Sequence, residues 1–206
     1  MLNSPTLPLL LASTSPSRRV LLSRLRVPFE VVAPSYEEPP LPRGHHEDAA
    51  VHAMALERAR GKATSVAEIN PGAVVIGSDQ ICLCEGELFG KPGTEERAIE
   101  QLTRLAGREH RLVGALVVAG PERDRWQSAV IETPLRLRKL RDDEIRAYVA
   151  LERPLDSAGA YYMESLGIAL FESIGGDDPT AIQGLPLITL VAMLEAAGYR
   201  VLANAR

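Results

Sequence analysis

The chain has 206 residues, 46% hydrophobic and 24% charged, and this ordinary globular composition excludes a fibre, a low-complexity segment and a disordered tail. Its 23 basic and 27 acidic residues give a net charge of -4, which argues against long nucleic acid as a partner, because such proteins usually carry a broad basic face. No apolar run approaches the ~20 residues of a membrane helix. We therefore expect one domain over residues 1–206, located in the cytoplasm and without a membrane partner.

The first third of the chain predicts two short strands, a short helix and a long helix. An apolar strand is expected over residues 7–12, and Ser13-Thr14-Ser15-Pro16 is typical of a helix start, with a hydroxyl cap and proline in the first turn. A second strand is expected over 29–33. The proline-rich segment 34–44 predicts a loop that carries Glu37 and Glu38. A long helix is expected over about 46–67.

The remainder alternates strands and helices without a strict βαβ order, which predicts an α/β fold with a mixed sheet. An apolar strand is expected at 73–76, interrupted by Gly-Ser-Asp-Gln at 77–80 and resumed at 81–83. The other expected elements are a helix from Thr94 to Gly107, paired strands over 109–119 and 126–138, a helix capped by Asp142, a strand at 168–171, and a last helix from Pro186 to Gly198.

Two cysteines, Cys82 and Cys84, lie in one expected strand and share a face of it. This placement is awkward for a mutual disulfide, and without a second cysteine pair a zinc site is not expected either. We expect reduced thiols packed in a core.

Arg18 and Arg19 stand in the first turn of the first expected helix, where the helix dipole disfavours cations by some tenths of a kcal/mol. With free backbone N–H groups and the hydroxyls of residues 13–15, they could form an anion trap for a phosphate ester. A solvated basic helix start is the alternative, and this segment alone does not decide between the two. No Walker-type phosphate loop occurs in the sequence.

Two carboxylates stand in unusual surroundings. Asp79 is flanked by apolar segments, so its charge needs a cation, a metal or a proton; it could bind a metal or activate water, or merely cap its own turn. Lys91, a short hairpin away, is within reach of the same place. Glu164 lies among small residues and aromatics and could accept hydrogen bonds from a base, although taken alone it suits a surface loop.

Five motifs in chain order resemble those of the Maf family of nucleotide pyrophosphatases. They are Leu-Ala-Ser-Thr-Ser-Pro-Ser-Arg-Arg at 11–19, Gly-Ser-Asp-Gln at 77–80, Gly-Lys-Pro at 90–92, Ala-Gly-Ala-Tyr at 158–161 and Gly-Leu-Pro at 184–186. Ser-Thr-Ser-Pro, Gln80 after the aspartate and Glu164 resemble the subgroup that acts on 7-methyl-GTP. The branch that acts on dTTP and UTP usually has threonine and glutamine at the latter two positions.

The resemblance implies a fold and an activity. The fold would be a mixed, elongated sheet flanked by helices, similar to Maf and ITPase proteins, with two lobes around a central cleft. The activity would be hydrolysis of a nucleoside triphosphate to the monophosphate and pyrophosphate, in a house-cleaning role, by a homodimer that uses Mg²⁺ or Mn²⁺. The resemblance leaves open a dTTP/UTP pyrophosphatase and a nucleotide-binding regulator of septum formation.

Site residues follow from the same motifs. Asp79 would accept a proton and share the metal with Glu37 or Glu38. The substrate would be bound by residues of the helix start, the long helix and the later motifs: Ser13, Ser15, Ser17, Arg18, Arg19, Arg58, Gln80, Lys91 and Glu164.

The chain departs from the family pattern at three places. Ser17 stands where the methyl-GTP subgroup usually has an aromatic residue, which puts part of the base-stacking surface in doubt. Arg58 stands where lysine is typical and lacks the compact ammonium geometry. Tyr162-Met163 replaces a more usual Lys-Ser. These departures bear on the choice of substrate more than on catalysis.

Overall fold

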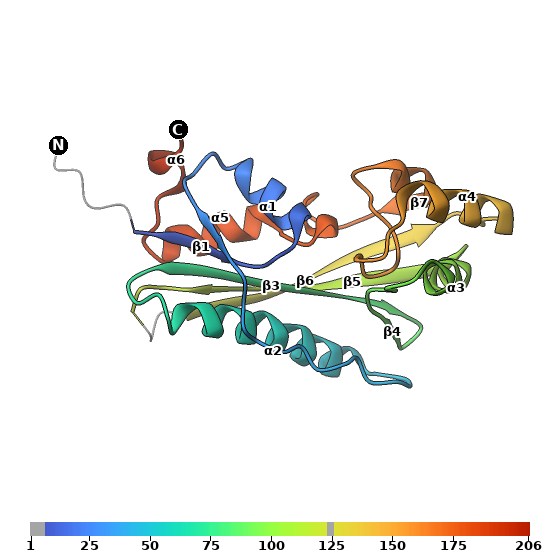
Figure 1. Ribbon diagram of the computed structural model, residues 1–206, viewed down its shortest axis with the longest axis horizontal. Coiled ribbons are helices and arrows are strands. Elements are labelled where there is room, and N and C mark those ends of the chain that lie inside the picture. Colours follow the sequence, from blue (N-terminus) through green and yellow to red (C-terminus); the bar gives the residue numbers. More distant parts are fainter. Residues whose placement is uncertain (1–6, 123–125) are drawn as a thin grey trace.

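The structure is a computed structural model and describes residues 7–122 and 126–206. Within these residues the chain forms one seven-stranded mixed sheet with helices on both faces (Figure 1). The strands are β1 (Leu9–Ala12), β2 (Glu30–Val32), β3 (Val74–Cys84), β4 (Glu87–Phe89), β5 (Glu109–Ala119), β6 (Trp126–Leu137) and β7 (Phe171–Ile174). The helices are α1 (Pro16–Ser23), α2 (Asp48–Ala67), α3 (Glu95–Leu105), α4 (Asp142–Glu152), α5 (Leu187–Ala196) and α6 (Val201–Asn204), with short 3-10 helices η1 (Leu166–Leu170) and η2 (Ala181–Gln183).

The strand order is β2-β1-β3-β5-β6-β7, with β4 paired to β3. β1 runs parallel to β2 and β3, whereas the other pairs are antiparallel. The prediction of a mixed α/β sheet is confirmed. The expected pairing of strands 109–119 and 126–138 is confirmed as well, since β5 and β6 pair along their whole lengths.

Three hydrophobic clusters show how the layers are arranged. Odd-numbered residues of β3, such as Val75 and Ile81, pack against α2 on one face of the sheet. Even-numbered residues face the other side, because side chains of a strand alternate. There Ile76 packs under α1 and α5 at one end of the sheet, and Cys82 packs under α3 and α4 at the other. These two groups of helices form the two expected lobes, which are well separated in Figure 1.

The sheet has an open notch in β3. β1 pairs with β3 over Val74–Gly77 and β4 pairs with it over Cys82–Cys84, so residues 78–81 have a neighbouring strand on the β5 side alone. We call residues 78–81 the notch. The expected interruption of the strand at 77–80 is therefore wrong for the backbone, since β3 continues through it on hydrogen bonds to β5. The polar residues of the notch instead lie where β3 has no paired strand, among the described residues, on the side opposite β5.

Some element boundaries differ from expectation. Residues 168–170 belong to η1, and the strand begins only at Phe171, where pairing with β6 becomes available. Arg141, not Asp142, is the N-cap of α4, and its backbone N–H is bound by the side chain of Glu144 at 2.9 Å. A short helix, α6, follows Gly198 unpredicted.

Both cysteines are free and buried as expected, and burial raises the pKa of the Cys82 thiol. Among the helices that the structure describes, none combines the length and apolar character needed to cross a membrane.

Candidate active site

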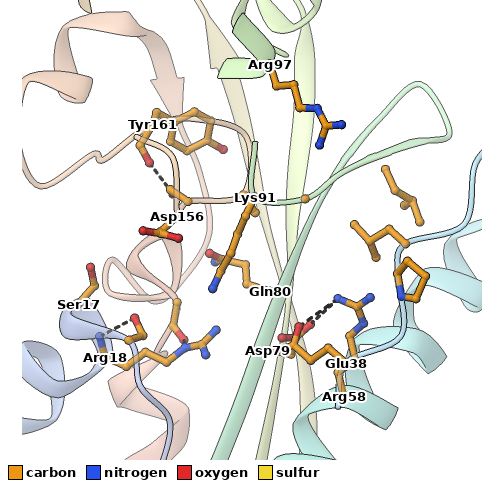
Figure 2. A pocket seen from close by; sticks show the side chains of 18 of the residues that line it. Ser17, Arg18, Glu38, Arg58, Asp79, Gln80, Lys91, Arg97, Asp156 and Tyr161 are labelled. Carbon is orange, nitrogen blue, oxygen red and sulfur yellow. Dashed lines mark hydrogen bonds and ion pairs between the residues drawn. The ribbon is translucent and has the colours of Figure 1, made fainter. Parts of the chain in front are cut away.

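A cavity of about 1280 Å³ lies between the two lobes and reaches the notch (Figure 2). Its walls come from the start of α1, the loop 38–44, α2, the notch, β4 and the segment that follows it, α3, the loop 156–164 and η2. Most of the predicted site residues line it: Ser15, Ser17, Arg18, Glu38, Arg58, Asp79, Gln80, Lys91 and Glu164. Segments far apart in the sequence are thus brought to one place, as the motifs predict.

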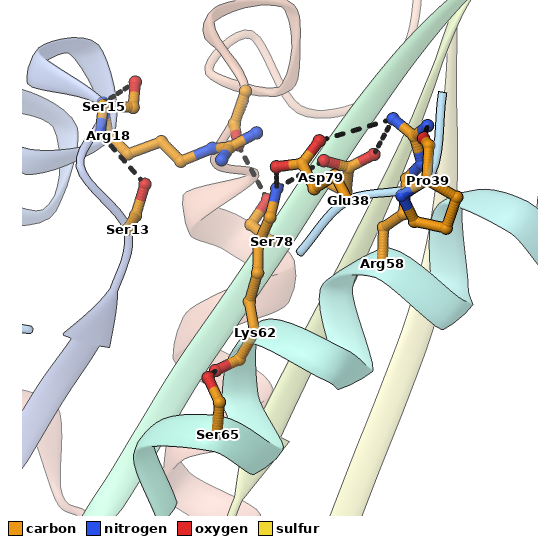
Figure 3. A network of polar contacts seen from close by, with 11 residues as sticks. Ser13, Ser15, Arg18, Glu38, Pro39, Arg58, Lys62, Ser65, Ser78 and Asp79 are labelled. Atoms are coloured by element: carbon orange, nitrogen blue, oxygen red, sulfur yellow. Dashed lines mark hydrogen bonds and ion pairs between the residues drawn. The ribbon is translucent and has the colours of Figure 1, made fainter. Parts of the chain in front are cut away.

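Asp79 lies in the notch with its side chain toward α2 and is 5% exposed. The ammonium Nζ of Lys62 is 2.6 Å from Asp79 Oδ1 and 2.6 Å from Glu38 Oε1, so one cation bridges two carboxylates (Figure 3). Arg58, one turn earlier on α2, adds its Nη1 at 3.4 Å from Glu38 Oε2 and 4.0 Å from Asp79 Oδ2. The charge that the sequence predicted at a costly position is therefore compensated by two buried cations.

Glycine at position 77 allows this contact. A Cβ atom there would lie 2.3 Å from the carbonyl oxygen of Ala59, closer than any real contact, so α2 approaches β3 because Gly77 has no side chain. Lys62 is on the same face of α2 as Ala59 and Ala63, which pack on the sheet. The close approach of helix and strand brings the ammonium to the carboxylate.

Lys62 was missed by the sequence reasoning. The compact ammonium that the resemblance leads one to expect at position 58 is supplied one turn later, and Arg58 adds a second cation. The signal that could have found Lys62 is a charged residue within a helix face that otherwise holds alanine and valine. Burial is costly for an isolated charge, so such a residue needs an acidic partner.

Glu38, not Glu37, faces the cavity. Burial opposes the ionisation of Glu38, but its hydrogen bond with Lys62 and the positive charges of Lys62, Arg58 and Lys91 outweigh this and hold its pKa below the usual value. Glu37 is exposed and is not among the described residues that line the cavity. Neighbouring side chains of an extended loop point in opposite directions, so only one of the two can face the site.

The start of α1 carries one of the two predicted arginines into the cavity. Ser15 caps the helix and its Oγ accepts the N–H of Arg18 at 3.5 Å, while Ser13 Oγ accepts the N–H of Ser15 at 3.1 Å. Ser13 is buried behind this turn and supports it without lining the cavity. Arg19 is exposed and outside the described lining, because successive helical residues diverge by about 100°.

The carbonyl of Gly184 holds Arg18 and the notch together. It accepts hydrogen bonds from Arg18 Nε at 3.0 Å and from Ser78 Oγ at 2.9 Å. Gly184 has a φ of 93°, in the left-handed region that favours glycine. Burial lowers the pKa of Arg18, while the carboxylates of Asp79 and Glu38 act in the opposite direction. The glycine of the Gly-Leu-Pro motif thus positions Arg18, a candidate for binding phosphate.

Further polar and acidic side chains line the cavity. Gln80 Nε2 donates to the carbonyl of Ala181 at 2.9 Å, which fixes the amide. Ser17 Oγ lies 3.1 Å from Glu164 Oε1, so the small residue at position 17 is hydrogen-bonded to the predicted specificity residue. Figure 2 shows the side chain of Lys91 extending from above toward Gln80 and Asp79.

The metal expectation can be tested against these side chains. In the described part of the chain, no group of three His, Cys, Asp or Glu residues converges closely enough to hold a metal ion. Glu38 and Asp79 do converge, and Asp79 Oδ2 is buried without a hydrogen-bond partner. Mg²⁺ is commonly bound through one or two carboxylates with substrate phosphates completing its shell. This donor set fits a cation that arrives with a triphosphate.

The chain is similar in sequence to known proteins. A family model described as Maf-like protein matches residues 8–197. The chain is 47% identical over 190 residues to the 7-methyl-GTP pyrophosphatase of Aromatoleum aromaticum, covering 92% of this chain and 95% of the relative. It is 46% identical over 199 residues to the 7-methyl-GTP pyrophosphatase of Cupriavidus metallidurans, covering 96% and 98%. Among solved structures, the Staphylococcus aureus Ham1 protein covers 91% of this chain and 98% of its own at 16% identity, with a TM-score of 0.44.

Proposed function

This chain belongs to the Maf family, and we propose that it hydrolyses 7-methyl-GTP to the nucleoside monophosphate and pyrophosphate. One observation carries the proposal. The bridged carboxylates of Glu38 and Asp79 share a single cavity with Arg18 and Lys91, which come from other elements. A triphosphate bears about four negative charges near neutral pH, and phosphoryl transfer depends on positioning and charge neutralisation. The cavity supplies fixed positive groups beside an acid.

We assign the steps to side chains as follows. Arg18, Lys91 and Lys62 bind the phosphates, so that the α-phosphorus lies beside the notch. Asp79 uses Oδ1 to accept from Lys62 and has Oδ2 left to orient a water and take its proton. The water oxygen bonds to the α-phosphorus, the bond to the bridging α–β oxygen breaks, and pyrophosphate leaves with that oxygen. A divalent cation held by Glu38 and Asp79 would supply further charge neutralisation.

Glu164, the acidic residue that we propose binds the base, supports a methylated purine as that base. Guanine offers adjacent N1–H and N2–H donors that suit the carboxylate of Glu164. Methylation at N7 gives the base a positive charge, which the carboxylate of Glu164 attracts. We also propose a homodimer located in the cytoplasm; light scattering on the purified protein tests the dimer.

A substrate panel tests the proposal. Pyrophosphate release is measured with 7-methyl-GTP, GTP, dTTP and UTP at equal concentrations, with and without Mg²⁺. The proposal predicts the highest kcat/KM for 7-methyl-GTP. A preference for dTTP or UTP would overturn the substrate while leaving a pyrophosphatase.

An Asp79→Asn variant separates turnover from binding. The amide keeps the size of the side chain but cannot take a proton, so turnover should collapse while the nucleotide still binds. Unchanged turnover in this variant would remove Asp79 from the reaction.

A further inference from the structure

Tyr162 is the aromatic side chain that the cavity wall offers to a ligand. Of the described residues that line the cavity, two are aromatic, Tyr161 and Tyr162. Tyr161 is only 3% exposed, its ring lies edge-on to Phe171 with the centroids 5.0 Å apart, and its hydroxyl is 3.0 Å from His110 Nε2. The ring of Tyr161 is therefore part of the hydrophobic core, whereas Tyr162 is half-buried.

The backbone of Tyr162 is held in place. Its N–H donates to the hydroxyl of Tyr148 at 2.9 Å, and Tyr148 belongs to the buried face of α4. Just before it, Gly159 and Ala160 adopt φ values of 80° and 59°, and a Cβ at Gly159 would lie 2.7 Å from the ring of Tyr161. The turn folds over the ring of Tyr161, and the next residue, Tyr162, lines the cavity.

Two acidic residues share the cavity with Tyr162. Asp156 and Glu164 line the same cavity, and Glu164 is hydrogen-bonded to Ser17, which offers no surface for stacking. Burial raises the pKa of Tyr162; a hydrogen bond to the backbone of Asp156 opposes this, whereas the negative charges of Asp156 and Glu164 add to it, so the phenol is neutral at pH 7. An aromatic ring in a cavity that also holds these two carboxylates favours a flat cation, because the face of the ring attracts positive charge.

We infer that Tyr162 stacks on the base and, together with Glu164, makes the site selective for a purine that carries a positive charge. This inference rests on the proposed function, since it concerns the base of that substrate. Stacking on an aromatic ring accepts any base, so neutral guanine binds there too, but only the methylated base adds attraction between cation and ring. Tyr162 is then a specificity-determining residue.

The test compares wild type with Tyr162→Leu and Tyr162→Phe, using 7-methyl-GTP and GTP. Leucine keeps the apolar bulk and removes the aromatic face, so kcat/KM for 7-methyl-GTP should fall roughly tenfold, mainly through KM, and that for GTP roughly two- to threefold. Phenylalanine retains a ring and should preserve the ratio of the two kcat/KM values within about twofold.

Each result bears on a different statement. If wild type prefers 7-methyl-GTP and Tyr162→Leu keeps that preference unchanged, or lowers both substrates equally, the role of Tyr162 is wrong and the proposed function stands. If wild type shows no preference for 7-methyl-GTP, the proposed substrate is wrong whatever the variants do. A shift carried by kcat alone would also contradict stacking, because a base remote from the reacting phosphorus contributes to binding.

Discussion

Lys62 makes the shortest ion pairs with the two carboxylates of the cavity among the described residues, since its ammonium lies 2.6 Å from both Glu38 and Asp79. Lys62→Gln removes that charge from a buried site and leaves Asp79 and Glu38 with Arg58, at 4.0 and 3.4 Å, as their remaining cation. We expect kcat/KM to fall by roughly a hundredfold or more, as for other preorganised electrostatic groups. Pyrophosphate release measured well below the unfolding temperature checks this.

The matched control is Lys139→Gln, because Lys139 is exposed and lies outside the described cavity lining. It should keep wild-type activity. Equal activity of the two variants would show that Lys62 is structural only.

His110 predicts a pH dependence of stability. Burial lowers its pKa to about 4 from 6.5. Below pH 6.5 the unfolded chain takes up a proton that the folded chain refuses until about pH 4, so this histidine makes folding less stable as pH falls through that window. Between about pH 5 and 7, above most carboxylate titrations, His110→Gln should flatten the slope of unfolding free energy against pH. Urea unfolding measures it, with exposed His45→Gln as the control; an unchanged slope in His110→Gln would contradict the assignment.

Candidate site residues could be selected from the sequence where the energetic cost or the motif is local. Asp79, Arg18, Lys91, Gln80 and Glu164 all line one cavity. Sequence reasoning could not separate Arg18 from Arg19 or Glu38 from Glu37, because the choice depends on the direction in which each side chain leaves the backbone. It also missed Lys62, whose partners are 24 residues upstream and 17 downstream; only the fold brings them together.

At the scale of elements, the contact between α2 and β3 sets the distance from Lys62 to Asp79. In Gly77→Ala the new Cβ would be 2.3 Å from the Ala59 carbonyl oxygen, so α2 must move outward. We expect a loss of about 1–3 kcal/mol in unfolding free energy, the usual cost of overpacking, together with reduced turnover. Denaturant unfolding and the pyrophosphate assay measure the two effects.

Gly114→Ala is the matched control. The Cβ atom added at position 114 would lie 3.5 Å from its nearest described neighbour, the Ile131 carbonyl oxygen, which is an ordinary contact distance. A Gly77→Ala variant as stable and active as Gly114→Ala would mean that the helix and strand are not in close contact.

Most elements could be predicted because their hydrophobic periodicity and caps are local signals, as for α1 with Ser15 and Pro16. The continuity of β3 could not, because the pairing of residues 78–81 with β5 is a long-range contact that overrides a turn-like composition. The same holds for η1, where the apolar run was read as a strand but pairing with β6 begins only at Phe171.

At the scale of the whole molecule, we propose that residues 1–206 form one domain despite the two lobes. β3 and β5 run through both, with Ile76 and Leu116 in one hydrophobic cluster and Cys82 and Leu112 in the other. Because both lobes share these strands, one lobe cannot unfold while the other stays folded. Heating should therefore give a single unfolding transition with equal calorimetric and van't Hoff enthalpies. Two separable transitions in scanning calorimetry would show two domains.

The cleft itself has no local sequence signal. It exists because β1 ends at Ala12 and β4 begins only at Glu87, which leaves the notch open between the lobes. The cleft was predicted from the resemblance of the motifs to the Maf family. Composition and hydrophobic periodicity alone predict only a mixed α/β sheet.

The position of bond cleavage is the most direct measure of what the notch does. Hydrolysis of 7-methyl-GTP in ¹⁸O-labelled water, followed by mass spectrometry of the products, identifies the phosphorus that the water attacks. Attack beside Asp79 on the α-phosphorus puts the label in the nucleoside monophosphate and leaves pyrophosphate unlabelled. Label in pyrophosphate, or release of orthophosphate, would place the reaction elsewhere on the chain of phosphates and contradict the assignment of Asp79.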